Sequence, residues 1–186
     1  MSRPVTHPDA AILDKSDRYD ASSHAGGGSG RFAPDVSVVA PTLPGMPLTK
    51  DEREGFLAAP HIGSLSVAVS GQGPLVVPIW YSYEPGGEVL ILTGAESRKI
   101  RHIREAGRFS LLAHQEQPTT RYVSVEGPVT GISPISDDQH RAMAARYLPP
   151  PMVDAFMRTV VYLGEQVAVT MRPERWLSAD IPLSDQ

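Results

Sequence analysis

The chain has 186 residues, of which 41% are hydrophobic, and it carries a formal net charge of −4 and no cysteine. This composition is that of an ordinary globular domain, and the lack of cysteine excludes disulfides, thiolate catalysis and cysteine-based zinc sites. The negative charge argues against general nucleic-acid binding, which depends on neutralising phosphates. No apolar run reaches the roughly 18 residues of a membrane span, and the first residues lack the apolar core of a signal peptide. We therefore expect a cytoplasmic protein that binds neither nucleic acid nor membrane.

The first 45 residues differ in composition from the rest of the chain. The stretch SSHAGGGSGRFAP, at 22–34, has the composition of a flexible linker. The apolar segment that follows is interrupted by Pro41 and Pro44. We expect residues 1–45 to be disordered or, alternatively, to form an extended arm on a partner subunit. The folded domain is expected at 46–178, with a C-terminal tail at 179–186.

A short helix is expected to open the folded domain. Thr49 and Glu52 have the spacing of a capping box, and the helical stretch DEREGFLAA follows. The pattern then changes to the alternation of strands. Three strands are expected, at 61–70, 75–83 and 88–93. The short turn sequences GQGP and PGG between them predict an antiparallel meander.

Three more strands are expected further along the chain, at 107–115, 120–132 and 165–176. Gly127 and Pro128 predict a bulge or bend within the second of these.

Helices are expected after Ser97, at 137–148 and at 152–163, with the triple proline 149–151 stopping the second of them. Together the elements predict a mainly β (α+β) fold, a six-stranded antiparallel β-barrel with flanking helices.

The helix after Ser97 has an unusual charge pattern, because Arg98 and Lys99 fall in its first turn, where the helix dipole favours acidic residues. A helix N-terminus presents unpaired N–H groups and partial positive charge. With two cations and the hydroxyls of Thr93 and Ser97 added, this point is a candidate site for a phosphate.

The alternative is a solvated basic face, in which Glu96 and Glu105 pair with the cations of the helix. The apolar and aromatic stretch PIWY, at 78–81, favours the phosphate site, since it would form a flat wall for a planar ring. Trp80 is expected in that wall, with packing in the core as the alternative.

The segment VPIWYSYEPGGEVLILTGAESRKIRHI, at 77–103, resembles the split β-barrel flavoproteins of the pyridoxamine 5′-phosphate oxidase-like superfamily. It is most similar to the branch that contains flavin- and deazaflavin-dependent oxidoreductases. The segment RYVSVEGPV, at 121–129, supports the resemblance, which extends from Leu48 to Trp176.

The resemblance implies a homodimer with two cofactors bound at the subunit interface. It implies that the following residues contact the cofactor ring: Val77, Pro78, Ile79 and Trp80. It implies that the cofactor phosphate is held by Thr93, Ser97, Arg98 and Lys99, and that Tyr122 reaches the cofactor of the other subunit. The cofactor is FMN or, alternatively, the deazaflavin coenzyme F-420, whose longer polyanionic tail would suit Arg101 and Arg104.

The C-terminal stretch RPERWLSADIPLSDQ does not match the substrate-binding arginine and histidine positions of the vitamin oxidases. A true pyridoxamine phosphate oxidase is therefore not expected. The sequence has no nucleophile elbow, P-loop or metal-binding motif, and we name no catalytic residue, since a flavin carries the hydride chemistry itself.

The leading hypothesis is an oxidoreductase that transfers hydride between the bound cofactor and a small planar or conjugated substrate. One alternative is a non-catalytic protein that carries a flavin, a deazaflavin or haem. For haem, His114 is the candidate axial ligand. Another alternative is a structural dimerisation barrel without cofactor.

Overall fold

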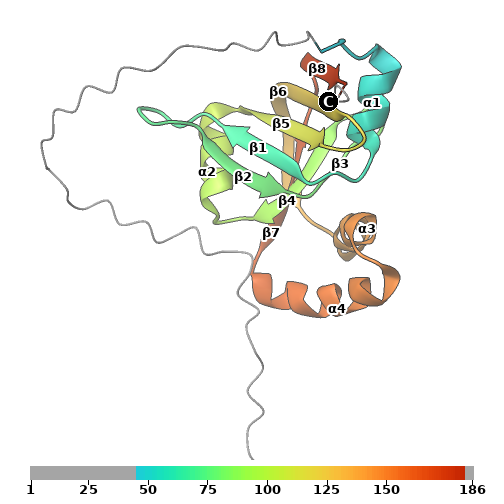
Figure 1. Ribbon diagram of the computed structural model, residues 1–186. Helices are drawn as coiled ribbons and strands as arrows, with labels where there is room; N and C mark the ends of the chain where they lie inside the picture. The colour runs from blue at the N-terminus through green and yellow to red at the C-terminus, as the bar shows by residue number, and fades with distance from the viewer. Residues whose placement is uncertain (1–44, 183–186) are drawn as a thin grey trace, which may run out of the picture. The chain divides into compact units, whose positions relative to one another are not determined.

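The computed structural model describes residues 45–182. Apart from Gly45, the expected N-terminal arm lies outside the described residues. The helices are α1 (Lys50–Ala58), α2 (Arg98–Ala106), α3 (Asp137–Tyr147) and α4 (Pro150–Val160), followed by the 3-10 turn η1 (Val161–Leu163). The strands are β1 (Gly63–Val67), β2 (Leu75–Ile79), β3 (Tyr81–Ser82), β4 (Val89–Gly94), β5 (Arg108–Gln115), β6 (Thr120–Pro134), β7 (Gln166–Met171) and β8 (Arg175–Ile181). Helices α3 and α4 lie together at one end of the sheet (Figure 1).

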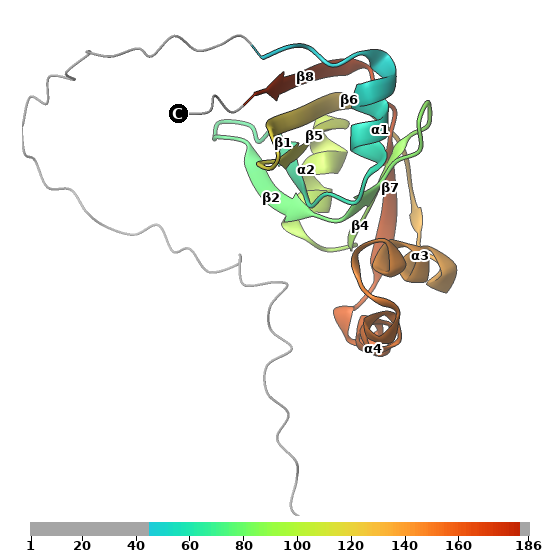
Figure 2. The same cartoon turned by 45° about the vertical axis from the view of Figure 1, so that its right-hand side comes forward.

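The strands form one antiparallel sheet in the order β2-β1-β5-β6-β7-β4-β3, and β8 pairs with β6 beside this path. Its two terminal strands, β2 and β3, are consecutive in the chain and are separated only by Trp80. The sheet therefore curls back towards itself as a split barrel (Figure 2). The mainly β class is confirmed, but the expectation of six strands is wrong, because the described chain has eight.

Two of the expected strands are each divided. The strand expected at 75–83 is broken at Trp80, where β2 leaves β1 and β3 begins to pair with β4. The strand expected at 165–176 ends at Met171 and a new strand starts at Arg175, because Pro173 between them has no N–H to donate to a ladder. Strand β8 continues to Ile181, three residues beyond the expected boundary at 178.

Strand β6 contains the expected irregularity near Gly127. Its register with β7 shifts between Val129 and Gly131. Before Gly127 β6 pairs with β8, and from Val129 onwards β6 pairs with β7. A Cβ atom on Gly127 would overlap the carbonyl group of Arg172. The strand can therefore cross from one part of the sheet to the other only with glycine at this position.

The helix starts follow local capping chemistry. The capping box of Thr49 and Glu52 is present at α1, as expected. The triple proline does more than stop α3, because Pro150 and Pro151 form the first turn of α4. Proline is tolerated there, since the first N–H groups of a helix have no partner within the helix. The fourth helix thus begins earlier than the expected residue 152.

The core lies inside the curled sheet. It is lined by the inward side chains of the strands, such as Leu65, Ile91, Leu111 and Val125. Helix α2 closes one side of this core with Ile100 and Ile103, both fully buried. Among the described helices none is long and apolar enough to cross a membrane.

Candidate functional site

The start of α2 is fixed by the loop that follows β4. Two backbone hydrogen bonds close the loop: Ala95 N–H donates to the carbonyl of Glu165 at 2.9 Å, and Ser97 N–H donates to the carbonyl of Gly94 at 3.1 Å. Ser97 has extended backbone and its Oγ accepts the N–H of Ile100 at 3.4 Å, so it is the N-cap, as expected. Because Ile100 is anchored in the core, the first turn of α2 has a defined position.

Two hydroxyl groups meet at this helix start. The Oγ1 of Thr93 lies 3.1 Å from the Oγ of Ser97. Thr93 is 4% exposed and is paired with Val167 of β7. The structure thus brings together the residues expected to hold a phosphate, since Thr93 and Ser97 are bonded and Arg98 and Lys99 follow directly.

The cations of α2 are not neutralised by the acidic residues of the described chain. Within residues 45–182, no carboxylate lies within 4.0 Å of the charged groups of Arg98, Lys99, Arg101 and Arg104. Glu105 contacts His102 at 3.2 Å instead, and Glu96 has no ion pair in this range. The pairing on which the solvated-face alternative relied is therefore not found, and the helix start carries net positive charge.

The residues expected to contact the cofactor ring lie on and after β2. Val77 and Ile79 pack against the core, whereas Pro78 is exposed on the opposite face. The ring of Trp80 stacks on Tyr147 of α3, with centroids 5.0 Å apart and an interplanar angle of 11°. It also lies 5.5 Å from the ring of Phe156 of α4. Trp80 therefore joins the strand junction to both helices.

Tyr122 belongs to a different part of the sheet and takes no part in the hydroxyl pair at α2. It lies on β6, opposite His114 of β5 and Ala179 of β8. Since its neighbour Val123 faces the core, Tyr122 faces outward. Two residues further along β6, a row of outward-facing side chains crosses the paired strands, and we call it the outer row. It is uncharged and consists of Pro78, Ser64, Leu112, Ser124 and Leu177. Pro78 and Tyr122 thus share one face of the sheet.

Sequence reasoning missed a polar clamp at the end of α3. The hydroxyl oxygen of Tyr147 lies 2.7 Å from the carbonyl oxygen of Tyr81 and accepts the Tyr81 N–H at 3.0 Å. Arg146 donates to the carbonyls of Ala58 and Ala59 at 2.6 and 2.8 Å. No sequence pattern marks these contacts, because residues 66 to 88 positions apart meet only in the folded chain. The clamp holds α3 against the strand junction at Trp80.

Tyr81 itself has a structural role at this junction. Its side chain is fully buried and its hydroxyl donates to the carbonyl of Leu57 at 3.0 Å. Burial raises the pKa of Tyr81 well above its ordinary value, so the phenol stays protonated. It therefore serves as a hydrogen-bond donor to the end of α1.

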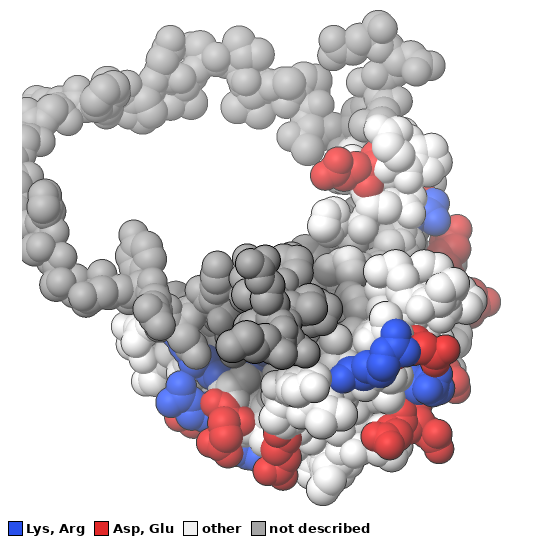
Figure 3. Space-filling model, turned by 90° about the horizontal axis from the view of Figure 1, so that it is seen from below, with Lys and Arg blue, Asp and Glu red and all other residues white. Residues whose placement is uncertain are grey.

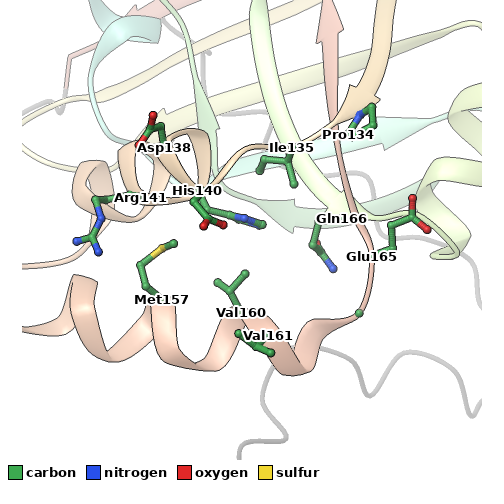
Figure 4. A pocket seen from close by; sticks show the side chains of 12 residues that line it. Pro134, Ile135, Asp138, His140, Arg141, Met157, Val160, Val161, Glu165 and Gln166 are labelled. Carbon is green, nitrogen blue, oxygen red and sulfur yellow. The ribbon is translucent and has the colours of Figure 1, made fainter.

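A pocket of about 540 Å³ lies between α3, α4 and the adjoining ends of β6 and β7 (Figure 4). Its lining includes Ile135, Asp137, His140, Met157, Val160 and Gln166. Gln166 is also the β7 partner of Gly94, at the end of β4. The pocket therefore borders the loop that leads into α2, and no sequence signal indicated it.

The curled antiparallel sheet, closed by a short helix that enters between β4 and β5, defines a split-barrel protein. A family model described as pyridoxamine 5′-phosphate oxidase matches residues 49–179, and the chain belongs to this family. The resemblance found in the sequence is thus confirmed.

Solved structures share the fold. A protein named F-420 reductase is 21% identical, with a TM-score of 0.54 over 67% of this chain and 94% of its own. A conserved hypothetical protein of Mycobacterium tuberculosis is 27% identical, with a TM-score of 0.56 over 72% of this chain and 85% of its own. An FAD-binding protein of Mesorhizobium loti is 21% identical, with a TM-score of 0.51 over 73% and 95%. No functionally curated protein matches the sequence.

Proposed function

We propose that this protein is an oxidoreductase that transfers hydride between a bound flavin-type cofactor and a small planar or conjugated substrate. The observation that carries the proposal is the start of α2, where the bonded hydroxyls of Thr93 and Ser97 adjoin two cations without an ion pair in residues 45–182. Backbone donors, hydroxyls and cations together match the chemistry of a phosphate group.

The side chains fit this assignment. The Oγ of Ser97 accepts a hydrogen bond from the N–H of Ile100. When the hydroxyl of Thr93 donates to the same oxygen, the hydroxyl hydrogen of Ser97 is available to donate to an anion. Lys99 and Arg98 supply charge, and Lys99 is half-buried, which strengthens its interaction with a ligand. The cofactor, when bound, supplies the hydride chemistry, and the protein supplies binding and orientation.

The cofactor is FMN or, alternatively, F-420. Arg101 and Arg104 are exposed and have no ion pair within the described residues, so they offer further positive charge for a polyanionic tail. Two structural neighbours are named an F-420 reductase and an FAD-binding protein, so a deazaflavin and a flavin both occur in these names.

We also propose that the active form is a homodimer. The uncharged outer row, with Leu177 64% exposed and Val76 beside the row 58% exposed, offers a surface for a second chain. Because Pro78 and Tyr122 share this face, a second chain on it would bring Tyr122 of one subunit towards Pro78 of the other. This supports a cofactor site built from both subunits.

The alternative is a protein that carries the cofactor without turning over a substrate. To separate the two, the protein is loaded with reduced FMN or reduced F-420 and mixed with a quinone under anaerobic conditions. An oxidoreductase reoxidises the cofactor at a rate that saturates with quinone and exceeds the rate of free cofactor. A rate equal to that of free cofactor, across a panel of conjugated acceptors, would favour the carrier.

A further inference from the structure

The pocket between α3 and α4 contains a buried histidine without a partner. His140 is 7% exposed, and within residues 45–182 its ring makes no hydrogen bond. Its ring points into the space between the two helices, above Val160 (Figure 4). The ring nitrogens are not among the fully buried side-chain atoms that lack a partner in the described residues, so they can be reached from the pocket. The imidazole is therefore available to a ligand in this pocket.

The remaining lining is apolar inside and acidic at the rim. Ile135, Met157 and Val160 line the hollow, while Asp138 and Glu165 stand at its edge (Figure 4). Asp137, one helical turn before His140, also lines the pocket. The surface seen from the side of these helices carries acidic and basic groups in mixture (Figure 3).

The charges at the pocket do not cancel. Arg141, the basic residue of its lining, is already bound to Asp154 at 2.7 Å. Asp137, Asp138 and Glu165 have no ion pair within the described residues. The pocket is thus negative, in contrast to the start of α2, and it disfavours phosphate or carboxylate ligands.

The chemistry of the lining narrows the class of ligand. The described residues contain no group of three or more His, Cys, Asp or Glu side chains placed to hold a metal ion. Burial lowers the pKa of His140, which keeps the ring neutral at pH 7 with one nitrogen free to accept a hydrogen bond. The volume is that of a small-molecule site.

We propose that this pocket binds a small organic amine. The ammonium group would donate to the free ring nitrogen of His140 and pair with Asp137, and the apolar part would pack on Met157 and Val160. The site is distinct from the anion site at Ser97, from which it is separated by the Gly94–Gln166 pair. Amine binding is therefore tested on the protein without cofactor.

The test uses three probes with one apolar body and different charges: 2-phenylethylamine, 2-phenylethanol and phenylacetate. Each is titrated into the full-length protein without cofactor, and binding is followed by calorimetry and by NMR of the methionine methyl groups. We expect saturable binding of the amine, about tenfold tighter than the alcohol, with the Met157 signal shifting. Phenylacetate should bind most weakly.

Variants connect the binding to the named groups. Asp137→Asn and His140→Phe should each weaken amine binding about tenfold. Asp51→Asn, at an exposed acidic residue in the first turn of α1, should leave it unchanged. If His140→Phe does not fold because residue 140 is buried, Asp137→Asn still tests the proposal. The proposal is overturned if no probe binds saturably at millimolar concentration, if phenylacetate binds most tightly, or if Asp137→Asn retains full affinity.

Discussion

The hydroxyl oxygens of Thr93 and Ser97 lie 3.1 Å apart, although one residue belongs to the last part of a strand and the other caps a helix. This contact ties the first turn of α2 to β4. The same serine thus caps the helix and, in the proposed function, also donates its hydroxyl to the cofactor phosphate. A pair of substitutions can separate these two roles.

Replacing Ser97 by alanine should lower the free energy of unfolding by about 1 kcal/mol, because α2 loses its cap. It should also weaken cofactor binding about tenfold, since a hydroxyl donor to the phosphate is lost. Thr49→Ala removes the cap of α1 in the same way, but away from the site. Chemical denaturation and calorimetric titration measure both effects. Equal cofactor affinity in the two variants would contradict the role of Ser97.

The exposed cations further along α2 distinguish the two candidate cofactors. Replacing both Arg101 and Arg104 by alanine should weaken binding of F-420 about three- to tenfold and leave FMN binding nearly unchanged, because only F-420 has a polyanionic tail. Arg175→Ala, at an exposed arginine that contacts Glu126, is the matched control. Calorimetry at low ionic strength measures the affinities. An equal loss of affinity for both cofactors would show that the two arginines do not bind the polyanionic tail of F-420.

The outer row of the sheet predicts the dimer interface. Leu177→Glu places a charge in the outer row, at its β8 end, and should convert the dimer to a monomer, as measured by size-exclusion chromatography with light scattering. Val161→Glu alters a residue that is 80% exposed on η1 and should leave the dimer intact. A monomeric wild-type protein, or dissociation by the change on η1 instead, would contradict this interface.

Two histidines predict how stability depends on pH. Burial lowers the pKa of both His61 and His140 below their ordinary value of 6.5. The folded protein then binds fewer protons than the unfolded chain as the pH falls below 6.5, so the free energy of unfolding should decrease from pH 7 to pH 5. His140→Gln should reduce this slope. Urea denaturation at several pH values gives the slopes, and an unchanged slope in His140→Gln would contradict the assignment.

Local signals in the sequence were sufficient for the starts of α1 and α2 and for the class of fold, but not for the start of α4. The caps at Thr49 and Ser97 were predicted because capping depends on a few neighbouring residues. The meander was predicted because short turns determine which strands pair. Trp80 was placed in a continuous strand because the sequence around it is β-branched and aromatic throughout. Its backbone is excluded from both ladders by the curvature of the sheet, which no local pattern encodes.

Part of the candidate site could likewise be predicted from neighbouring residues, and part could not. Thr93, Ser97, Arg98 and Lys99 are close in the chain, so their meeting at the start of α2 could be predicted. The pocket around His140 is formed by segments from both sides of the α3–α4 connection and by the start of β7. Such a site depends on how two helices pack against a strand end, and the spacing of its residues in the chain does not reveal it.

The central claim is that the start of α2 binds the phosphate of a flavin-type cofactor. The most direct measurement is an equilibrium titration of the purified protein with FMN and with F-420, followed by fluorescence, and repeated with Lys99→Ala. We predict tight binding of one of the two cofactors and a loss of affinity of about tenfold or more in the variant. Binding of neither cofactor, or full affinity without Lys99, would contradict the account.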